Sequence, residues 1–326
     1  MGDPVGIGPE IILFALSQPD IFSICKPFVL GDIPMLESAK RYTGSMIDLN
    51  PIHNPDEGKY RAGSIDVVSL SELDPGSIQP GKPSARTGKA MVNYITVAID
   101  MAIRGQISAI VTCPINKAAM QLAGFHYNGH TELLMEKTKA GNVVMMLAGS
   151  MLRVVPVTIH MPLKAVSAFL TTEKIFKAIS ITNRGLTEYF GLKEPRIAVV
   201  GLNPHAGEEG IFGDEEHRII APAIVQAKKE GYDTEGPFPS DTFFYHAKNG
   251  NYDAVVCMYH DQGLIPFKMI HFNDGVNTTL GLPIIRTSVD HGTAYDIAGT
   301  GKANPGSLLA AIKMAIEQIL NSAKMK

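Results

Sequence analysis

The apolar and polar positions of this 326-residue chain follow two patterns in alternation. Short runs rich in Val, Ile and aromatic residues, bounded by Gly or Pro, are typical of β-strands, and apolar residues spaced three or four apart are typical of α-helices. The strands predicted in this way cover residues 28–30, 66–69, 109–112, 143–147, 153–158, 196–200 and 254–258. The predicted helices cover residues 9–16, 87–103, 172–189, 215–229 and 306–322. This alternation predicts an α/β protein with a largely parallel sheet.

Glycine-rich segments lie near both ends of the chain, at residues 2–8 and 292–306. A chain of this length suggests two domains. If both glycine-rich segments serve one ligand, the two ends share a discontinuous domain and the middle forms a second one. The predicted ranges are 1–123 with 265–326 for the first domain and 124–264 for the second. We expect the substrate in a cleft between the two, where such sites often lie.

The composition limits the class of partner. The chain is 45% hydrophobic and 19% charged, with a net charge of −3, so charge gives no reason to expect nucleic acid or a membrane surface. Its three cysteines, Cys25, Cys113 and Cys257, are far apart and indicate neither a disulfide framework nor a zinc site. Reduced thiols, the lack of a basic leader and the lack of a long apolar run predict a cytoplasmic protein.

Three histidines each follow the end of a predicted strand: His160, His205 and His260. The carboxyl ends of parallel strands face the ligand crevice in α/β sheets. Three neutral imidazoles there could hold a divalent cation and leave positions open for substrate oxygens. For each histidine alone, a structural role or a role as a lone general base is the alternative. Their spacing matches no short metal motif.

Other polar residues stand out against apolar surroundings. His130 and Thr131 precede a predicted apolar helix, where Thr131 could cap the helix or donate to an oxyanion. Lys268, Asn277 and Arg286 lie in a mostly apolar stretch, and a charge in such a stretch usually has a partner. Arg binds carboxylate or phosphate with two parallel donors, although an internal salt bridge is an equal alternative.

Two segments could bind a cofactor. Residues 2–10 lead straight into a helix and could form either a ligand loop or a tight turn, but they do not match the dinucleotide pattern G-x-G-x-x-G. Residues 290–307 form a loop with several glycines that is long for an ordinary connection. Its Asp296 could accept both hydroxyls of an adenosine ribose, which favours NAD over NADP.

The 290–307 loop resembles the cofactor loop of the isocitrate and isopropylmalate dehydrogenases. Residues 2–10 are similar to the N-terminal glycine segment of those enzymes, with an insertion at Pro4 and Val5. Four further segments narrow the resemblance: residues 130–132, 203–208, 259–263 and 286–294. Together they resemble the 4-hydroxythreonine-4-phosphate dehydrogenase family of vitamin B6 synthesis, over nearly the whole chain.

That resemblance implies a fold of the isocitrate/isopropylmalate dehydrogenase type, with two α/β domains and no Rossmann domain. It implies a homodimer in which two metal ligands come from one subunit and the third from its partner. The implied ligands of the divalent metal, which would be zinc, cobalt or magnesium, are His160, His205 and His260. The implied substrate-binding residues are His130, Thr131, Lys268, Asn277 and Arg286. The implied NAD-binding residues are Gly6, Gly8, His291, Asp296 and Asn304. Candidates for the general base are Asp261, Asp241 and Lys117.

The implied reaction is the oxidation of a small phosphorylated hydroxy acid by NAD, assisted by the metal. For this family the substrate is 4-phosphooxy-L-threonine, and decarboxylation then gives 3-amino-2-oxopropyl phosphate. A related dehydrogenase acting on 4-phospho-D-threonate or 4-phospho-D-erythronate would share the metal and cofactor residues, so it is an alternative. A second alternative, a metal- or nucleotide-binding protein without catalysis, would be expected to lack part of this set.

Overall fold

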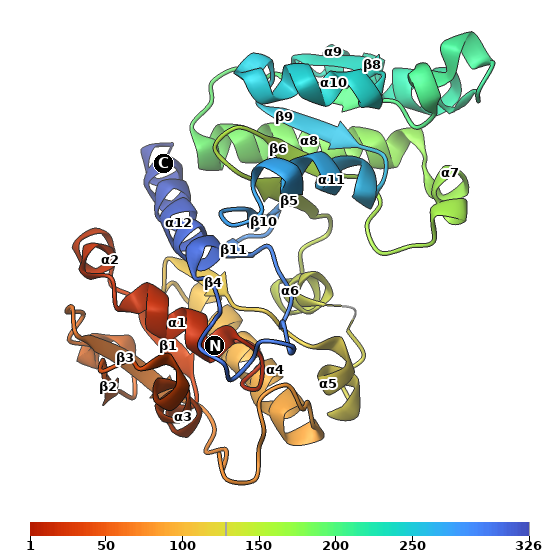
Figure 1. Ribbon diagram of the computed structural model, residues 1–326. Coiled ribbons are helices and arrows are strands. Elements are labelled where there is room, and N and C mark those ends of the chain that lie inside the picture. The colour runs from red at the N-terminus through yellow and green to blue at the C-terminus, as the bar shows by residue number, and fades with distance from the viewer. Residues whose placement is uncertain (128, 326) are drawn as a thin grey trace. The chain divides into compact units, whose positions relative to one another are not determined.

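A computed structural model describes residues 1–127 and 129–325 of the chain (Figure 1). It divides into two compact units. The first unit comprises Met1–Ala140 and Pro283–Ile316, and the second comprises Gly141–Leu282 and Glu317–Lys326. Both units are discontinuous, and their limits differ from the ranges that the sequence predicts for two domains. Helix α6 (His130–Thr138) packs on α4 (Ala85–Ile103) of the first unit, so it belongs to that unit. Helix α11 (His260–Ile270) packs on strands of the second unit and belongs there.

The pairs that the strands of the first unit form with one another are parallel. One sheet has the order β1-β3-β2, and β4 pairs with β11. Their bounds are β1 Phe28–Gly31, β2 Asp48–Pro51, β3 Ser64–Ser69, β4 Ala109–Thr112 and β11 Ile285–Val289. The helices that lie in this unit are α1 Gly8–Leu16, α2 Pro19–Ile24, α3 Ile33–Thr43, α4 Ala85–Ile103, α5 Lys117–Leu122 and α6, together with most of α12 Gly306–Lys324.

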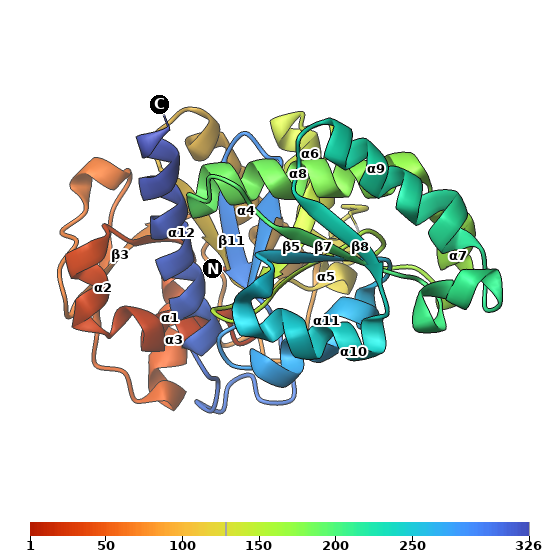
Figure 2. The same ribbon diagram turned by 90° about the horizontal axis from the view of Figure 1, so that it is seen from above.

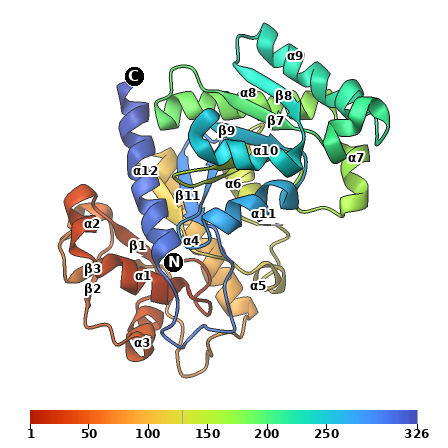
Figure 3. The same ribbon diagram turned by 45° about the horizontal axis from the view of Figure 1, so that its top comes forward.

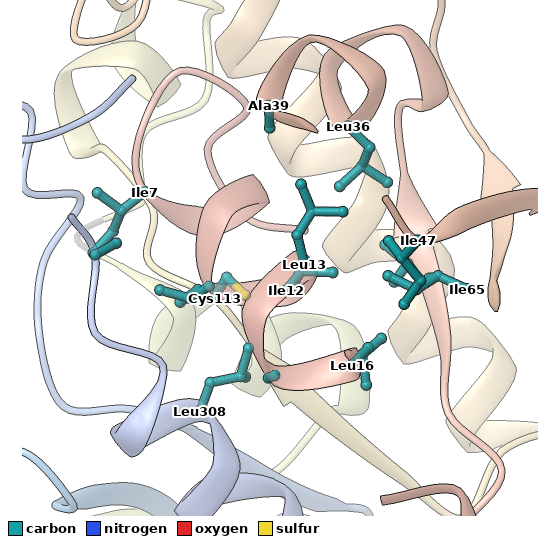
Figure 4. Close-up of a cluster of buried hydrophobic side chains, with 14 of the residues drawn as sticks. Ile7, Ile12, Leu13, Leu16, Leu36, Ala39, Ile47, Ile65, Cys113 and Leu308 are labelled. Atoms are coloured by element: carbon teal, nitrogen blue, oxygen red, sulfur yellow. The ribbon is translucent and has the colours of Figure 1, made fainter. Parts of the chain in front are cut away.

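Helix α1 forms the centre of the first unit's core. Its sequence, GPEIILFAL, is apolar on nearly every side, which is typical of a helix buried all round. Figure 4 shows Leu13 facing Leu36 of α3, with Ile65 of β3 on one side of α1 and Leu308 on another. The polar exception in α1 is Glu10, which is fully buried. A buried carboxylate needs hydrogen-bond donors, so Glu10 marks a contact beyond simple packing.

The second unit contains the strand order β10-β5-β6-β9-β7-β8. Strand β5 runs antiparallel to both of its neighbours, and the other pairs are parallel. The bounds are β5 Val144–Ala148, β6 Arg153–Pro156, β7 Ile197–Val200, β8 Thr234–Phe238, β9 Ala254–Cys257 and β10 Val276–Leu280. Strands β7 and β9, with sequences IAVV and AVVC, are buried at every position, as expected for parallel strands covered on both faces.

Helices cover both faces of the second unit's sheet. Figure 2 shows α8 (Thr172–Phe190) and α9 (Ala221–Lys229) on one face, with α10 (Ser240–His246) and α11 on the other. The short helix α7 (Val166–Phe169) projects beyond the edge of this sheet (Figure 3). The three predicted histidines, His160, His205 and His260, follow the ends of β6, β7 and β9.

The predicted α/β class is confirmed. Every predicted strand and helix is present, with ends within two residues of the predicted ones; the predicted helix at 215–229 is a short π-helix, Glu216–Ile220, followed by α9. The elements that were not predicted are mostly short or only weakly periodic, such as β2, β8 and α10. Within residues 1–127 and 129–325, no helix combines the length and apolar character needed to cross a membrane.

Candidate active site

The parallel pairing of β6 with β9 brings two of the predicted imidazoles together. The pairing continues past both strands, because the Val157 amide donates to Cys257 (2.8 Å) and the Thr158 hydroxyl donates to the Met258 carbonyl (2.8 Å). His160 and His260 follow, and their ring centroids lie 5.9 Å apart with an angle of 41° between the rings. One divalent cation could contact both rings at this separation.

The Asp261 carboxylate fixes the state of the His260 ring. A carboxylate only accepts, so the Nδ1–H of His260 donates to Asp261 Oδ1 at 2.7 Å. In a neutral ring this leaves the lone pair on Nε2, the atom that would bind a metal. Histidine ligands commonly donate their other ring N–H to a carboxylate in this way. The donor set therefore fits a divalent cation. In the described part of the chain, however, no group of three His, Cys, Asp or Glu residues could hold one by itself.

His205 lies in an unusual turn after β7. The backbone has positive φ angles at His205 (51°), Ala206 (53°), Glu208 (41°) and Glu209 (57°), as well as at Gly207 (85°). A left-handed conformation costs about 1–2 kcal/mol for each residue that carries a Cβ. Such a turn persists only where its surroundings hold it in place. The His205 side chain is exposed, and its ring lies 6.2 Å from that of Phe212.

A buried carboxylate holds the start of this turn. Glu216 is 1% exposed, and its Oε1 accepts from the amides of Leu202 and Asn203, both at 2.7 Å. Gln262 holds Gly201, the residue before Leu202. Its Nε2 donates to the Gly201 carbonyl at 2.6 Å, and its Oε1 accepts from the Met258 amide at 2.7 Å. Neither Glu216 nor Gln262 is among the site residues predicted from the sequence.

Arg286 of β11 is a buried cation in the first unit. It is 2% exposed, and its Nη2 donates to the Thr112 hydroxyl at 2.7 Å. Burial lowers the pKa of Arg286 to about 9, so the guanidinium is still charged at neutral pH. Because a buried charge is costly unless an opposite charge or hydrogen bonds offset it, an anionic ligand at this place would be stabilised.

His130 lies close enough to Arg286 for the two to interact electrostatically. Burial, and then the charge of Arg286, hold the pKa of His130 well below its usual value, so its ring is neutral at neutral pH. Its Nε2 atom is enclosed and has no hydrogen-bond partner among residues 1–127 and 129–325. An enclosed polar atom of this kind indicates a group that a ligand can complete.

Two further predicted residues lie near His130. Helix α6 begins at His130 after Gly129, whose φ is 154°, and has no side-chain cap. Of the two roles open to Thr131, capping is therefore excluded; Thr131 lies in the first turn, where the unpaired amides of a helix favour an anion. Lys117 begins α5, and its Cε lies 3.9 Å from the position that a Cβ on Gly129 would take. These residues and Arg286 form a group suited to phosphate or carboxylate.

Two further predicted substrate-binding residues, Lys268 and Asn277, and the general-base candidate Asp241 lie in the second unit. Lys268 is in the last turn of α11 and is half-buried. Asn277 is in β10, and its Oδ1 is enclosed without a hydrogen-bond partner in the described ranges. Asp241 lies in the first turn of α10 with an exposed side chain.

The two glycine-rich segments lie together in the first unit. The Ile7 amide donates to the Thr293 carbonyl at 3.1 Å. A Cβ on Gly6 would lie 3.0 Å from that of Thr293, and one on Gly8 would lie 2.4 Å from the Met1 carbonyl, so both positions need glycine for close packing. The two segments therefore contact each other directly.

Two buried carboxylates anchor the 290–307 loop. Glu10 accepts from the amides of Gly299 (2.7 Å) and Gly301 (2.8 Å). Asp3 accepts from the Tyr295 hydroxyl and from the Val5 amide. Neither residue is among the site residues predicted from the sequence. For Glu10 the signal is a charged residue inside an apolar helix, which usually has a specific partner.

Three of the predicted NAD-binding side chains lie on this loop. Asp296 is exposed, as expected of a carboxylate that could accept ribose hydroxyls. Asn304 Oδ1 accepts from the Gly306 amide (2.8 Å) at the start of α12, and His291 Nδ1 lies 3.0 Å from the Gly292 carbonyl. An exposed carboxylate and the N-terminus of a long helix on a glycine-rich loop are features that fit a dinucleotide.

Comparison with known proteins gives the class. The chain is similar to the crystal structure of 4-hydroxythreonine-4-phosphate dehydrogenase from Klebsiella pneumoniae, with a TM-score of 0.87 and 42% identity over 98% of this chain and 96% of that one. It is thus a dehydrogenase, an enzyme of the oxidoreductase class, as the sequence analysis predicted.

The chain belongs to the family described as pyridoxal phosphate biosynthetic protein PdxA, whose model matches residues 23–315. It is 58% identical to 4-hydroxythreonine-4-phosphate dehydrogenase of Desulforapulum autotrophicum, over 98% of this chain and 94% of the relative. It is also 44% identical to a protein of Symbiobacterium thermophilum named as a D-threonate 4-phosphate dehydrogenase, over 96% and 93%. The predicted family is confirmed.

The buried Asp3 generates a prediction about pH. Burial raises the pKa of Asp3 above its ordinary value of 3.8, so the folded protein binds this proton more tightly than the unfolded chain does. The favourable contribution is complete below pH 3.8 and is lost as the pH rises through the folded pKa. The free energy of unfolding of the wild type should therefore fall relative to that of Asp3→Asn between pH 4 and pH 7. Urea unfolding of both proteins across this range measures the difference, and a constant difference would contradict the prediction.

Proposed function

We propose that this chain uses NAD and a divalent metal to oxidise 4-phosphooxy-L-threonine, with decarboxylation to 3-amino-2-oxopropyl phosphate, in the synthesis of pyridoxal 5′-phosphate. The observation that carries the proposal is the buried Arg286 beside the neutral, enclosed imidazole of His130. The level of identity adds support, since it is 58% to a relative with that dehydrogenase name and 44% to one named for D-threonate 4-phosphate.

The first unit would bind the anionic part of the substrate. Arg286 offers a planar set of donors that suits a phosphate or carboxylate, and Lys117 adds a second positive charge close to the start of α6. His130 is neutral, so its Nε2 can donate or accept without adding charge. Together with the first-turn amides of α6, these groups would hold the substrate in one orientation.

In the second unit, His160 and His260 would hold the metal, with Asp261 fixing the ring of His260. A divalent cation held there would supply a Lewis acid for the substrate hydroxyl. Imidazole ligands favour zinc or cobalt over magnesium. Because Asp261 is engaged with His260, we assign it an orienting role, which leaves Lys117 and Asp241 as candidates for the general base. Lys268 and Asn277 of this unit are further candidates for substrate contacts.

The third ligand, His205, would act in a homodimer. Within the described residues of one chain no group of three potential ligands forms, so a third protein ligand would come from a partner copy. Ile211 and Phe212, which follow the turn that carries His205, are exposed apolar side chains of the kind that another protein often covers. We therefore propose that His205 of one copy reaches the metal of the other.

NAD would bind in the first unit, along the loop that Glu10 and Asp3 anchor. Asp296 would accept the ribose hydroxyls, while Gly6, Gly8, His291 and Asn304 would shape the backbone near the cofactor. When bound, NAD accepts the hydride from the substrate carbon. The alternative substrates 4-phospho-D-threonate and 4-phospho-D-erythronate would use the same groups, and the Symbiobacterium relative is the observation that favours them.

A spectrophotometric assay of NADH formation tests the proposal. The purified protein is given 4-phosphooxy-L-threonine, 4-phospho-D-threonate or 4-phospho-D-erythronate, each with and without a metal chelator. We expect the highest kcat/KM with 4-phosphooxy-L-threonine and no NADH after chelation, with recovery on adding zinc or cobalt. A higher kcat/KM with either D-substrate would transfer the assignment to the related dehydrogenases, and an undiminished rate after chelation would remove the metal from the reaction.

Arg286→Lys tests the anion-binding group. Lysine keeps the charge but cannot supply the planar pair of donors, so KM should rise about 10- to 100-fold, the equivalent of one charged hydrogen bond. Arg104→Lys, at an exposed position of the same unit, is the control and should leave KM unchanged. Steady-state kinetics with the preferred substrate gives both values, and an equal KM in the two variants would argue against this role of Arg286.

Mixing two inactive variants tests the shared metal site. His205→Ala and His260→Ala should each be inactive alone. After subunit exchange we expect about a quarter of the wild-type rate, because about half of the dimers are mixed and each mixed dimer has one complete site. No recovery, in a mixture that mass measurement shows to contain mixed dimers, would mean that His205 does not complete the partner's site.

A further inference from the structure

We propose that Glu216 is a positioning residue, whose buried carboxylate holds the left-handed turn in the conformation that presents His205 to the metal. The inference rests on the proposed role of His205 as a ligand. Glu216 is not expected to touch metal, substrate or cofactor. It would act only through the backbone and side chain of the segment that leads into the turn.

The carboxylate is surrounded by donors from that segment. Glu216 Oε1 accepts from the amides of Leu202 and Asn203 at 2.7 Å each, and its Oε2 accepts from Asn203 Nδ2 at 2.9 Å. Asn203 Nδ2 also donates to Glu215 Oε2 at 2.7 Å. Hydrogen bonds to an ionised acceptor are stronger than neutral ones, and here they converge on the residue that directly precedes Pro204 and His205.

The turn is built closely around this carboxylate. A Cβ on Gly201 would lie 2.9 Å from Glu216 Oε1, and a Cβ on Gly207 would lie 2.7 Å from Oε2. The two glycines lie on either side of His205 in the sequence, so the carboxylate contacts the segment both before and after the ligand. Gly207 also has a φ of 85°, which disfavours any other residue.

The backbone between these glycines needs such support. Residues 205–209 all have positive φ, and four of them carry a Cβ, which makes this conformation unfavourable by itself. If the carboxylate is removed, the amides of residues 202 and 203 lose their acceptor, and the turn can relax toward ordinary φ values. The position of the His205 ring would then no longer be defined, while the rest of the sheet keeps its packing.

The test compares wild type, Glu216→Gln, Glu216→Ala and His205→Ala, with Glu230→Gln as the control. Glu230 is an exposed acid at the end of the adjoining helix α9. Glu216→Gln keeps the volume and one acceptor oxygen but places an NH₂ group against Asn203, whereas Glu216→Ala removes every acceptor. Two quantities are measured: the hydrogen exchange of amides 202–212 in metal-free protein, and the dissociation constant for Co²⁺ from its visible absorption.

We expect faster exchange at residues 202–212 in both Glu216 variants, with no change in strand β7. We also expect Co²⁺ binding to weaken about 10- to 100-fold in Glu216→Gln, as is usual when a group supporting a ligand is lost, and further in Glu216→Ala. Glu230→Gln should match the wild type in both measurements. If Glu216→Ala fails to fold, Glu216→Gln alone decides the result.

Unchanged exchange at residues 202–212 in Glu216→Gln would overturn the inference, as would faster exchange with an unchanged Co²⁺ affinity. A failure of the proposed function has a different signature. In that case His205→Ala binds Co²⁺ as tightly as the wild type, although hydrogen exchange at residues 202–212 in Glu216→Gln is still faster. That outcome would contradict both the ligand assignment of His205 and the positioning role of Glu216.

Discussion

In each unit, a buried carboxylate that accepts from two backbone N–H groups holds the loop on which the proposed chemistry depends. Glu10 accepts from the amides of Gly299 and Gly301, and Glu216 accepts from those of Leu202 and Asn203. Both carboxylates are almost completely buried, where a charge is stable only if donors surround it. The loops are irregular and rich in glycine, so these bonds replace the ladder of hydrogen bonds that a strand or helix would supply.

The predicted strands and helices were those with long or strongly apolar patterns. The runs at 197–200 and 254–257 are continuous β-branched and apolar segments buried on both faces, and α8 and α12 repeat their apolar residues over several turns, so local pattern is enough to predict them. Strand β2, by contrast, is partly exposed and reads DLNP, which has neither alternation nor β-branched residues. Its place depends on pairing with β3, a long-range contact that no local pattern reveals.

In the candidate site too, residues marked by a local pattern could be predicted, and residues that act through long-range contacts could not. His160 and His260 could be predicted because each follows a buried strand, and parallel pairing carries both to one end of the sheet. The supporting residues could not be predicted in this way. Glu216 lies 13 residues from Asn203, and Gln262 lies 61 from Gly201, so only the folded chain shows what they hold. Thr131 illustrates a local rule that failed, since the helix begins at His130 and its N-cap is Gly129, two residues before Thr131.

The turn at residues 205–209 has a consequence for variation in sequence length. A left-handed segment cannot lengthen by adding turns as an ordinary helix can, and the glycines on either side of it contact the same carboxylate. An insertion or deletion between positions 201 and 207 would change the spacing of the two glycines, so that they could no longer both lie against Glu216. The number of residues in this segment is therefore under tighter constraint than the identity of the exposed side chains it carries.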